Sequence, residues 1–274
     1  MKQRKFAVSR RGLIKLGALS LVASPTIAVA QALSDDLVLE EQWGDLSLAP
    51  ETIEFNPYQI GELSTSRVQG SMTDRIKSFR SNFLEIAGEF EGYNRSEHEN
   101  EITRFLNLFR LDFRYGARQK YTPYCAAGVS YVAALTYWRE ANTTDQVPTL
   151  AELRAFLIEV GSYHFYPTVS VIDMYHVALG TRRWIARSDT PEPGWLVLFD
   201  WKQNGGANHV GIVESVILDE DQTQPVALNT LEFNTVMENA SGSQRDGGYV
   251  ARRVRSLNGT IKGYINTDAR NPFR

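Results

Sequence analysis

The hydrophobic pattern of this chain changes its period near residues 191–194, where the sequence reads Pro-Glu-Pro-Gly. Before this point apolar residues recur at intervals of three and four, as they do on one face of an α-helix. After it they form short runs rich in Val, Ile and aromatic residues, separated by turn residues, as in β-strands. Helices followed by strands predict an α+β fold with N-terminal helices packed on a C-terminal antiparallel β-sheet.

The same periodicity gives approximate bounds for the individual elements. A Pro in the first turn favours a helix that begins near residue 123. A Thr-Leu-Ala-Glu capping box favours another that begins at residue 149. We expect helices at about 71–90, 100–112, 123–140, 149–161 and 170–180, and strands at 195–201, 209–218, 226–233, 249–254 and 261–265.

The first thirty residues have the features of an export signal. Ser9–Lys15 resembles the twin-arginine motif, a mild apolar stretch follows, and Ala28–Ala30 has the small-x-small pattern of a cleavage site. An uncleaved anchor is the alternative, but the apolar stretch is well short of the roughly 20 residues that span a bilayer. We expect cleavage after Ala30, with Ala32 as the next candidate, a periplasmic or secreted protein, and no stable membrane insertion after cleavage.

Composition divides the remainder into two parts and excludes one class of partner. Residues 31–70 are rich in Pro, Ser and acids and predict an extended or loosely docked segment, whereas residues 71–274 predict one compact domain. The formal charge is −3, and the export signal holds six basic residues and no acids, so the remaining chain carries −9. We therefore expect that it does not bind nucleic acid. We also expect a monomer. Residues 245–274 are locally basic; they either attract a substrate with carboxylates or form a solvated strand face.

Cys125 is the only cysteine, so an internal disulfide is excluded. The predicted helix places it in the first turn, where unpaired backbone N–H groups and the helix dipole favour a thiolate. The same N–H groups could bind the oxyanion of a tetrahedral intermediate. The alternative is a small buried hydrophobic residue, and position alone does not decide between the two.

His209 opens a predicted strand that turns back around residues 220–222. In an antiparallel hairpin with this turn, residues whose numbers sum to about 442 lie opposite one another, so His209 faces residues 232–234. Alternation places Glu232 and Asn234 on one face, and either could accept a hydrogen bond from the imidazole.

The other histidines are weaker candidates for a base. His98 lies in a charged stretch and is expected on the surface, while His164 and His176 lie among aromatic residues and are expected in the core or at its rim. None of the histidines has the spacing of a metal site, and one Cys cannot supply a Cys-rich zinc site. We expect no metal and no cofactor.

Four segments resemble the CHAP domain, the cysteine, histidine-dependent amidohydrolase/peptidase group of the papain-like superfamily of cell-wall enzymes. They are similar to its nucleophile helix, its first strand, its base strand and the strand with the third polar group, and they lie at residues 123–127, 193–200, 209–213 and 231–235. The resemblance implies a papain-like fold and amide cleavage in peptidoglycan, at the N-acetylmuramoyl-L-alanine bond or within the stem peptides. It also implies Cys125 as nucleophile, His209 as base and then acid, Glu232 as the orienting residue, and Asn234 as a second polar position.

The chain departs from the family pattern at several positions. Tyr124 stands where the family usually has Trp, and Gly128 where an aromatic residue is common. Trp195 replaces an Asp of the first strand, and Phe233 replaces the Gly between Glu and Asn. Because Trp195 and Phe233 could reshape the substrate cleft, they motivate an alternative hypothesis, a cell-wall-binding module that kept the fold but lost turnover. The sequence also leaves open whether an active enzyme would act on the cell's own wall or on that of a competitor or host.

Overall fold

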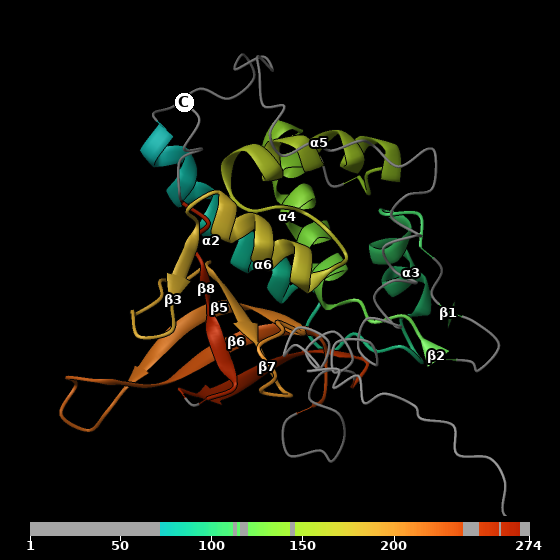
Figure 1. Cartoon of the computed structure of the whole chain (residues 1–274). Coiled ribbons are helices and arrows are strands. Elements are labelled where there is room, and N and C mark those ends of the chain that lie inside the picture. The colour runs from blue at the N-terminus through green and yellow to red at the C-terminus, as the bar shows by residue number, and fades with distance from the viewer. Residues whose placement is uncertain are drawn as a thin grey trace, which may run out of the picture. The chain divides into compact units, whose positions relative to one another are not determined.

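The computed structural model describes residues 72–111, 114–115, 120–142, 146–237, 247–257 and 259–268. Within them the helices precede the six-stranded antiparallel sheet, which confirms the predicted α+β fold (Figure 1). The predicted export signal and residues 31–70 lie outside the described residues. In the part of the chain that is described, no helix has both the length and the apolar character needed to cross a membrane.

Each of the predicted helices is present, with shifted ends. They are α2 (Met72–Gly88), α3 (Glu99–Asn107), α4 (Cys125–Ala141), α5 (Leu150–Tyr163) and α6 (Val171–Gly180). The predicted capping box of α5 is confirmed, with Thr149 and Glu152 as its members. Helix α3 ends at Asn107 rather than at residue 112, because Arg110 adopts a left-handed conformation (φ 60°) and the Leu111 N–H then bonds back to the Leu106 carbonyl at 3.1 Å.

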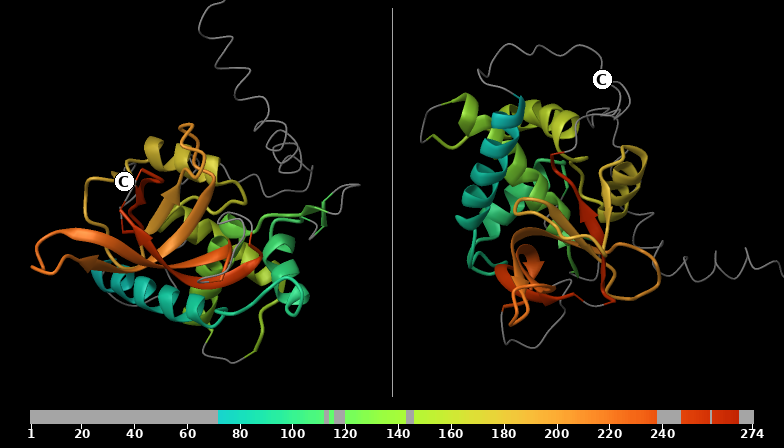
Figure 2. Two further views of the ribbon diagram at one scale, coloured as in Figure 1. Left: turned by 90° about the horizontal axis from the view of Figure 1, so that it is seen from below. Right: turned by 90° about the vertical axis from the view of Figure 1, so that its left-hand side faces the viewer.

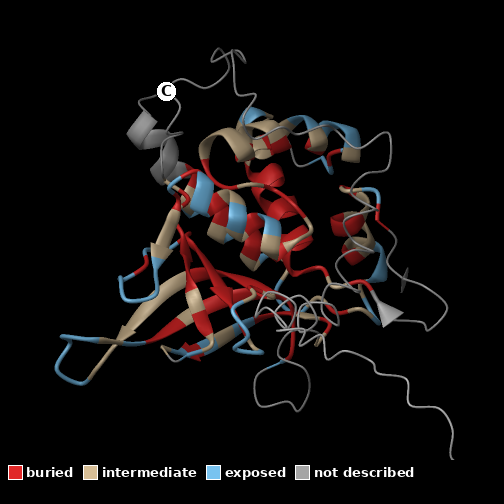
Figure 3. Cartoon of the chain, in the orientation of Figure 1, coloured by how far each residue is buried: buried red, intermediate tan, exposed pale blue. Residues whose placement is uncertain are grey.

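Helix α4 is the central helix of the fold. It contacts α2, α3 and α5 as well as strands β5 and β6, and Figure 3 shows it coloured as buried along most of its length. Its sequence is apolar or small on nearly every side, as expected of a helix that is surrounded by other elements. The start of α4 is therefore fixed by packing on all sides.

The main sheet has the strand order β3-β8-β4-β5-β6-β7. Figure 2 shows this sheet and the helices from two further sides. Its strands are β3 (Trp184–Ala186), β4 (Leu196–Phe199), β5 (His209–Leu218), β6 (Pro225–Thr235), β7 (Tyr249–Ser256) and β8 (Ile261–Ile265). The sequence prediction missed β3, whose three residues pair with β8, and a separate two-stranded sheet of β1 (Arg114–Tyr115) and β2 (Lys120–Tyr121). The other five strands were predicted.

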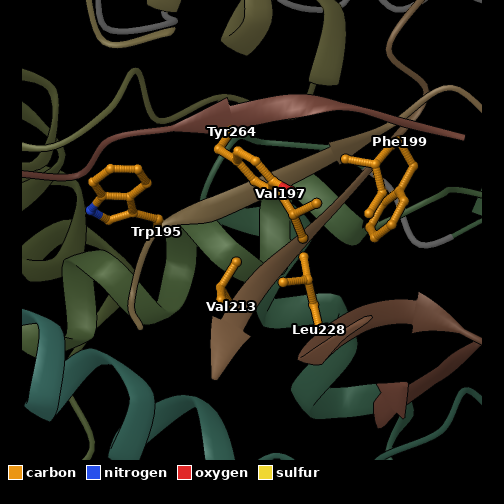
Figure 4. Packing of buried hydrophobic residues seen from close by; sticks show 7 residues of the cluster. Trp195, Val197, Phe199, Val213, Leu228 and Tyr264 are labelled. Atoms are coloured by element: carbon orange, nitrogen blue, oxygen red, sulfur yellow. The ribbon is translucent and has the colours of Figure 1, made fainter. Parts of the chain in front are cut away.

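A cluster of apolar side chains covers one face of the sheet (Figure 4). Val197 and Phe199 of β4 share this face with Trp195, the residue just before the strand, and Val213 and Leu228 join them from the next two strands. Phe199 also pairs directly with His209 across the β4–β5 ladder. The sheet core therefore holds the first residue of β5 in place.

Candidate active site

Cys125 is the first residue of α4, so it lies in the first turn as predicted, although the helix begins two residues later than expected; it is 5% exposed. Tyr124 occupies the N-cap position, and no side chain in the described part of the chain caps the helix there. The first intrahelical hydrogen bond runs from the Gly128 N–H to the Tyr124 carbonyl at 2.8 Å. The N–H groups before Gly128 in this turn thus have no acceptor within the helix, which is the arrangement that binds and stabilises negative charge.

The predicted hairpin register is confirmed to within one residue. Gly211 pairs with Glu232 and Ile212 with Leu231, so paired residue numbers sum to 443. Glu232 therefore lies diagonally across from His209, and both side chains point to the same face of the sheet.

Glu232 accepts a hydrogen bond from His209 Nε2, with 2.9 Å between Nε2 and Oε2. Both side chains are fully buried. Gly211 makes this contact possible, because a Cβ at that position would lie 2.8 Å from Glu232 Cγ. The absence of a side chain at residue 211 lets the glutamate lean along the ladder to the imidazole.

The protonation of the imidazole follows from this contact. An ionised carboxylate can only accept hydrogen bonds, so Nε2 must carry a proton. In the described residues Nδ1 makes no hydrogen bond of standard geometry to oxygen or nitrogen, and in the neutral ring it carries the free lone pair. Nδ1 is thus the nitrogen able to accept a proton from a thiol.

The side chains of Cys125 and His209 interact. Burial by itself lowers the pKa of His209, but hydrogen bonds to Cys125 and Glu232 and the charges of both partners outweigh burial and raise this pKa from 6.5 to about 9. The imidazolium form is therefore favoured at neutral pH, and an imidazolium beside a thiol favours the thiolate.

Asn234 occupies a different environment from Glu232. The β6–β7 ladder is irregular between Glu232 and Thr235, and Asn234 has a left-handed conformation with φ of 59°. Its Oδ1 accepts a hydrogen bond from Arg95 Nη2 at 2.5 Å. The regular alternation behind the sequence prediction stops at this irregularity, and Glu232 is the residue that contacts Nε2.

The remaining histidines have other surroundings. His164 is buried between the Tyr137 hydroxyl and the Thr267 carbonyl, each 2.7 Å from a ring nitrogen, so it is a core residue as predicted. His98 is half-buried at the start of α3, where it stacks on Tyr93 and its Nδ1 accepts from the Asn94 N–H at 3.3 Å. His176 is exposed. No group of His, Cys, Asp or Glu suited to a metal ion occurs within the described residues.

Two strands and one helix start thus bring a thiol, an imidazole and a carboxylate together in the chain order Cys, His, Glu. Residues 114–226 match the CHAP domain family model. The CHAP match contains Cys125 and His209 and ends before Glu232 and Asn234. Comparisons with curated proteins and with solved structures found no match.

Two of the departures from the CHAP pattern compensate for each other. A Cβ on Gly128 would lie 2.4 Å from Phe233 Cδ1, so the Phe233 ring fills the space beside this helical glycine. An aromatic ring from the strand thus occupies the space beside the helix. Trp195 is buried in the sheet core, where its Nε1 donates to Asp268 at 3.3 Å. Because Trp195 and Phe233 both lie in the core, neither presents a surface to substrate.

The sequence prediction missed the partners that hold Glu232. Its Oε1 accepts from Thr230 Oγ1 and from Arg255 Nε, each at 2.7 Å, and Oε2 accepts from Arg255 Nη2 at 2.6 Å. The only signal was the basic composition of residues 245–274. That region is partly neutralised, since Arg255 pairs with Glu232 and the exposed Arg252 pairs with Glu91 and Glu214.

Proposed function

We propose that this protein is an exported cysteine amidohydrolase that cleaves amide bonds in peptidoglycan, with Cys125 as nucleophile and His209 as general base and acid. The observation that carries the proposal is the chain of contacts from the thiol through the imidazole to Glu232. The match of residues 114–226 supports the substrate class, because CHAP domains are generally found in peptidoglycan amidases and peptidases.

The proposed reaction has two steps, formation of a thioester on Cys125 and its hydrolysis. The Cys125 thiolate attacks the amide carbonyl carbon, and the N–H groups at the start of α4 bind the oxyanion. The His209 imidazolium gives its proton to the departing amine nitrogen as the C–N bond breaks, which leaves a thioester on Cys125. His209 then takes a proton from water while the water oxygen attacks the thioester, and collapse of this intermediate releases the acid and restores the thiolate.

Glu232 holds the imidazole in the tautomer that both steps need, and Asn234 is a second polar group close by. The bond cleaved is either the N-acetylmuramoyl-L-alanine bond or one within the stem peptides, since the same groups attack both carbonyls. Export to the periplasm or the medium, which the N-terminal motif indicates, would bring the enzyme to this substrate.

Digestion of purified sacculi tests the proposal. The protein lacking residues 1–30 should release soluble fragments, whereas Cys125→Ala should not, and mass spectrometry of the fragments identifies the broken bond. Equal release by both proteins would contradict a cysteine mechanism. Removing residues 31–70 in a further variant tests whether that segment restrains the activity.

A second candidate function is a wall-binding module without turnover. The observation that favours it is the low exposure of Cys125, 5%, since free cysteines are often inert core residues. Iodoacetamide labelling near pH 6 distinguishes the enzyme from the binding module. If Cys125 is a nucleophilic thiolate, it is alkylated quickly, and the alkylation rate falls in His209→Ala. A thiol that stays unreactive in a protein that still sediments with sacculi would favour the module.

A further inference from the structure

Arg255 binds the carboxylate that orients His209, and it does so with two parallel hydrogen bonds. Nε contacts Oε1 at 2.7 Å and Nη2 contacts Oε2 at 2.6 Å. Paired contacts of this kind between a guanidinium and a carboxylate fix the geometry of both groups as well as their charge. Oε2 is also the oxygen that accepts from His209, so one carboxylate oxygen is shared between the guanidinium and the imidazole.

The guanidinium is itself held in place. Arg255 is 8% exposed, and its Nη2 also donates to Thr235 Oγ1 at 3.2 Å. The guanidinium carbon lies 4.9 Å from the centre of the Trp201 ring and 5.6 Å from that of Phe199. Arg255 forms an ion pair with Glu232 from β6, and His209 from β5 lies on the far side of this carboxylate, with Cys125 from α4 beyond the imidazole.

Arg255 adds a positive charge to the groups of the site. In the reactive form the site holds a thiolate, an imidazolium and a carboxylate, which together carry one negative charge in a buried place. The Arg255 guanidinium brings the sum over these four groups to zero. A buried carboxylate that had only the imidazole as partner would take up a proton more readily, and a protonated Glu232 no longer selects the required tautomer.

We propose that Arg255 is a positioning residue of this site, one that keeps Glu232 ionised and aimed at His209 and balances the negative charge that the thiolate, the imidazolium and the carboxylate carry together. This inference rests on the proposed cysteine chemistry and deepens it. It also extends the contact chain to four residues, Cys125, His209, Glu232 and Arg255, from one helix and three adjacent strands.

The expected direction of the effect follows from the loss of a positive charge. Burial raises the pKa of Glu232, but hydrogen bonds from Arg255 and His209 outweigh burial and hold this pKa well below its usual value of 4.5. Removing the guanidinium makes every nearby group harder to deprotonate. The pKa values of Glu232, Cys125 and His209 should therefore all rise.

The test uses Arg255→Met, which keeps an unbranched side chain without the charged group, and Arg255→Lys, which keeps the charge without the paired contact. Arg252→Met is the matched control, because Arg252 is on the same strand and pairs with Glu91 and Glu214 instead. The readout is the rate of iodoacetamide alkylation against pH. Cys125 is the only thiol, so the signal reports this site alone and needs no peptidoglycan.

In Arg255→Met we expect the acid limb of the alkylation profile to move up by about one pH unit, which makes alkylation about tenfold slower below that limb. Arg255→Lys should move it by less than half as much, and Arg252→Met should leave it unchanged. A folded Arg255→Met protein with the wild-type profile would overturn the proposal. So would an equal shift in Arg252→Met.

Carbon-13 NMR of Glu232 in the wild-type protein provides a measurement that does not depend on whether Arg255→Met folds. Its carboxylate should stay ionised as the pH falls through 4.5, and protonation at or above that pH would contradict the inference. Failure of the proposed function would give a different result. The wild-type protein would then leave sacculi intact, while Glu232 would still stay ionised as the pH falls.

Discussion

Gly211→Ala adds one methyl group at the point where Glu232 leans toward His209. The new Cβ would lie 2.8 Å from Glu232 Cγ, whereas carbon atoms in contact prefer about 3.5–4.0 Å. The glutamate must therefore move by roughly 1 Å. It has no room to move closer to its other partners, because Arg255 and Thr230 already contact its two oxygens at 2.6–2.7 Å. The contact with His209 Nε2 is expected to lengthen.

The magnitude has a stability part and an activity part. Overpacking of a filled site costs about 1–3 kcal/mol of the free energy of unfolding. A misplacement of about 1 Å in a supporting group lowers turnover by about a hundredfold. We expect the loss in kcat rather than in KM, since Glu232 acts through His209 and is fully buried.

The assay compares initial rates of dye release from labelled sacculi at a temperature where melting curves show each protein folded. Gly259→Ala is the control: an added Cβ there meets nothing within 4 Å, and both stability and rate should stay near wild type. A folded Gly211→Ala protein with wild-type kcat would refute the reasoning that Glu232 must reach His209 across a bare backbone.

Three further predictions follow from the same geometry. Gly128→Ala should cost about 1–3 kcal/mol of unfolding free energy in urea titrations, because its Cβ would meet Phe233, and Phe233→Leu should recover part of that loss; full stability in the single variant would contradict the packing. Cys125→Ala removes a hydrogen bond that raises the pKa of His209, so the His209 pKa measured by NMR should fall below about 9. An unchanged pKa would contradict a contact between the thiol and the imidazole. The pKa of His209 is higher in the folded protein than the 6.5 of a free imidazole, so the stability that His209 contributes is fully present below pH 6.5 and is lost as the pH rises through about 9. The melting temperature should therefore fall between pH 6.5 and about 9, and the fall should be smaller in His209→Ala.

Features that depend on neighbours in the sequence were predicted well. The helix that begins at Cys125 follows from the preceding Pro and the apolar run after it, and the capping box at Thr149 is a pattern of four residues. His209 lies across from the region of Glu232 because of the position of one turn, since the place where the chain reverses sets the register of a hairpin. The sequence alone therefore determined the order of elements, the α+β class and the residues proposed to react.

Contacts that depend on several elements at once were decided only by the tertiary structure. Arg255 reaches Glu232 because β7 pairs with β6 in one particular register, through a connection that no local pattern specifies. The exchange between Gly128 and Phe233 depends on how α4 packs against β6. The choice of Glu232 over Asn234 as the contact of Nε2 depends on an irregularity at the end of β6. Strand β3 depends on pairing with β8, which lies much later in the sequence. Side-chain periodicity is a local property of the backbone, whereas burial, ionisation and steric fit at this site are set by groups far apart in the sequence.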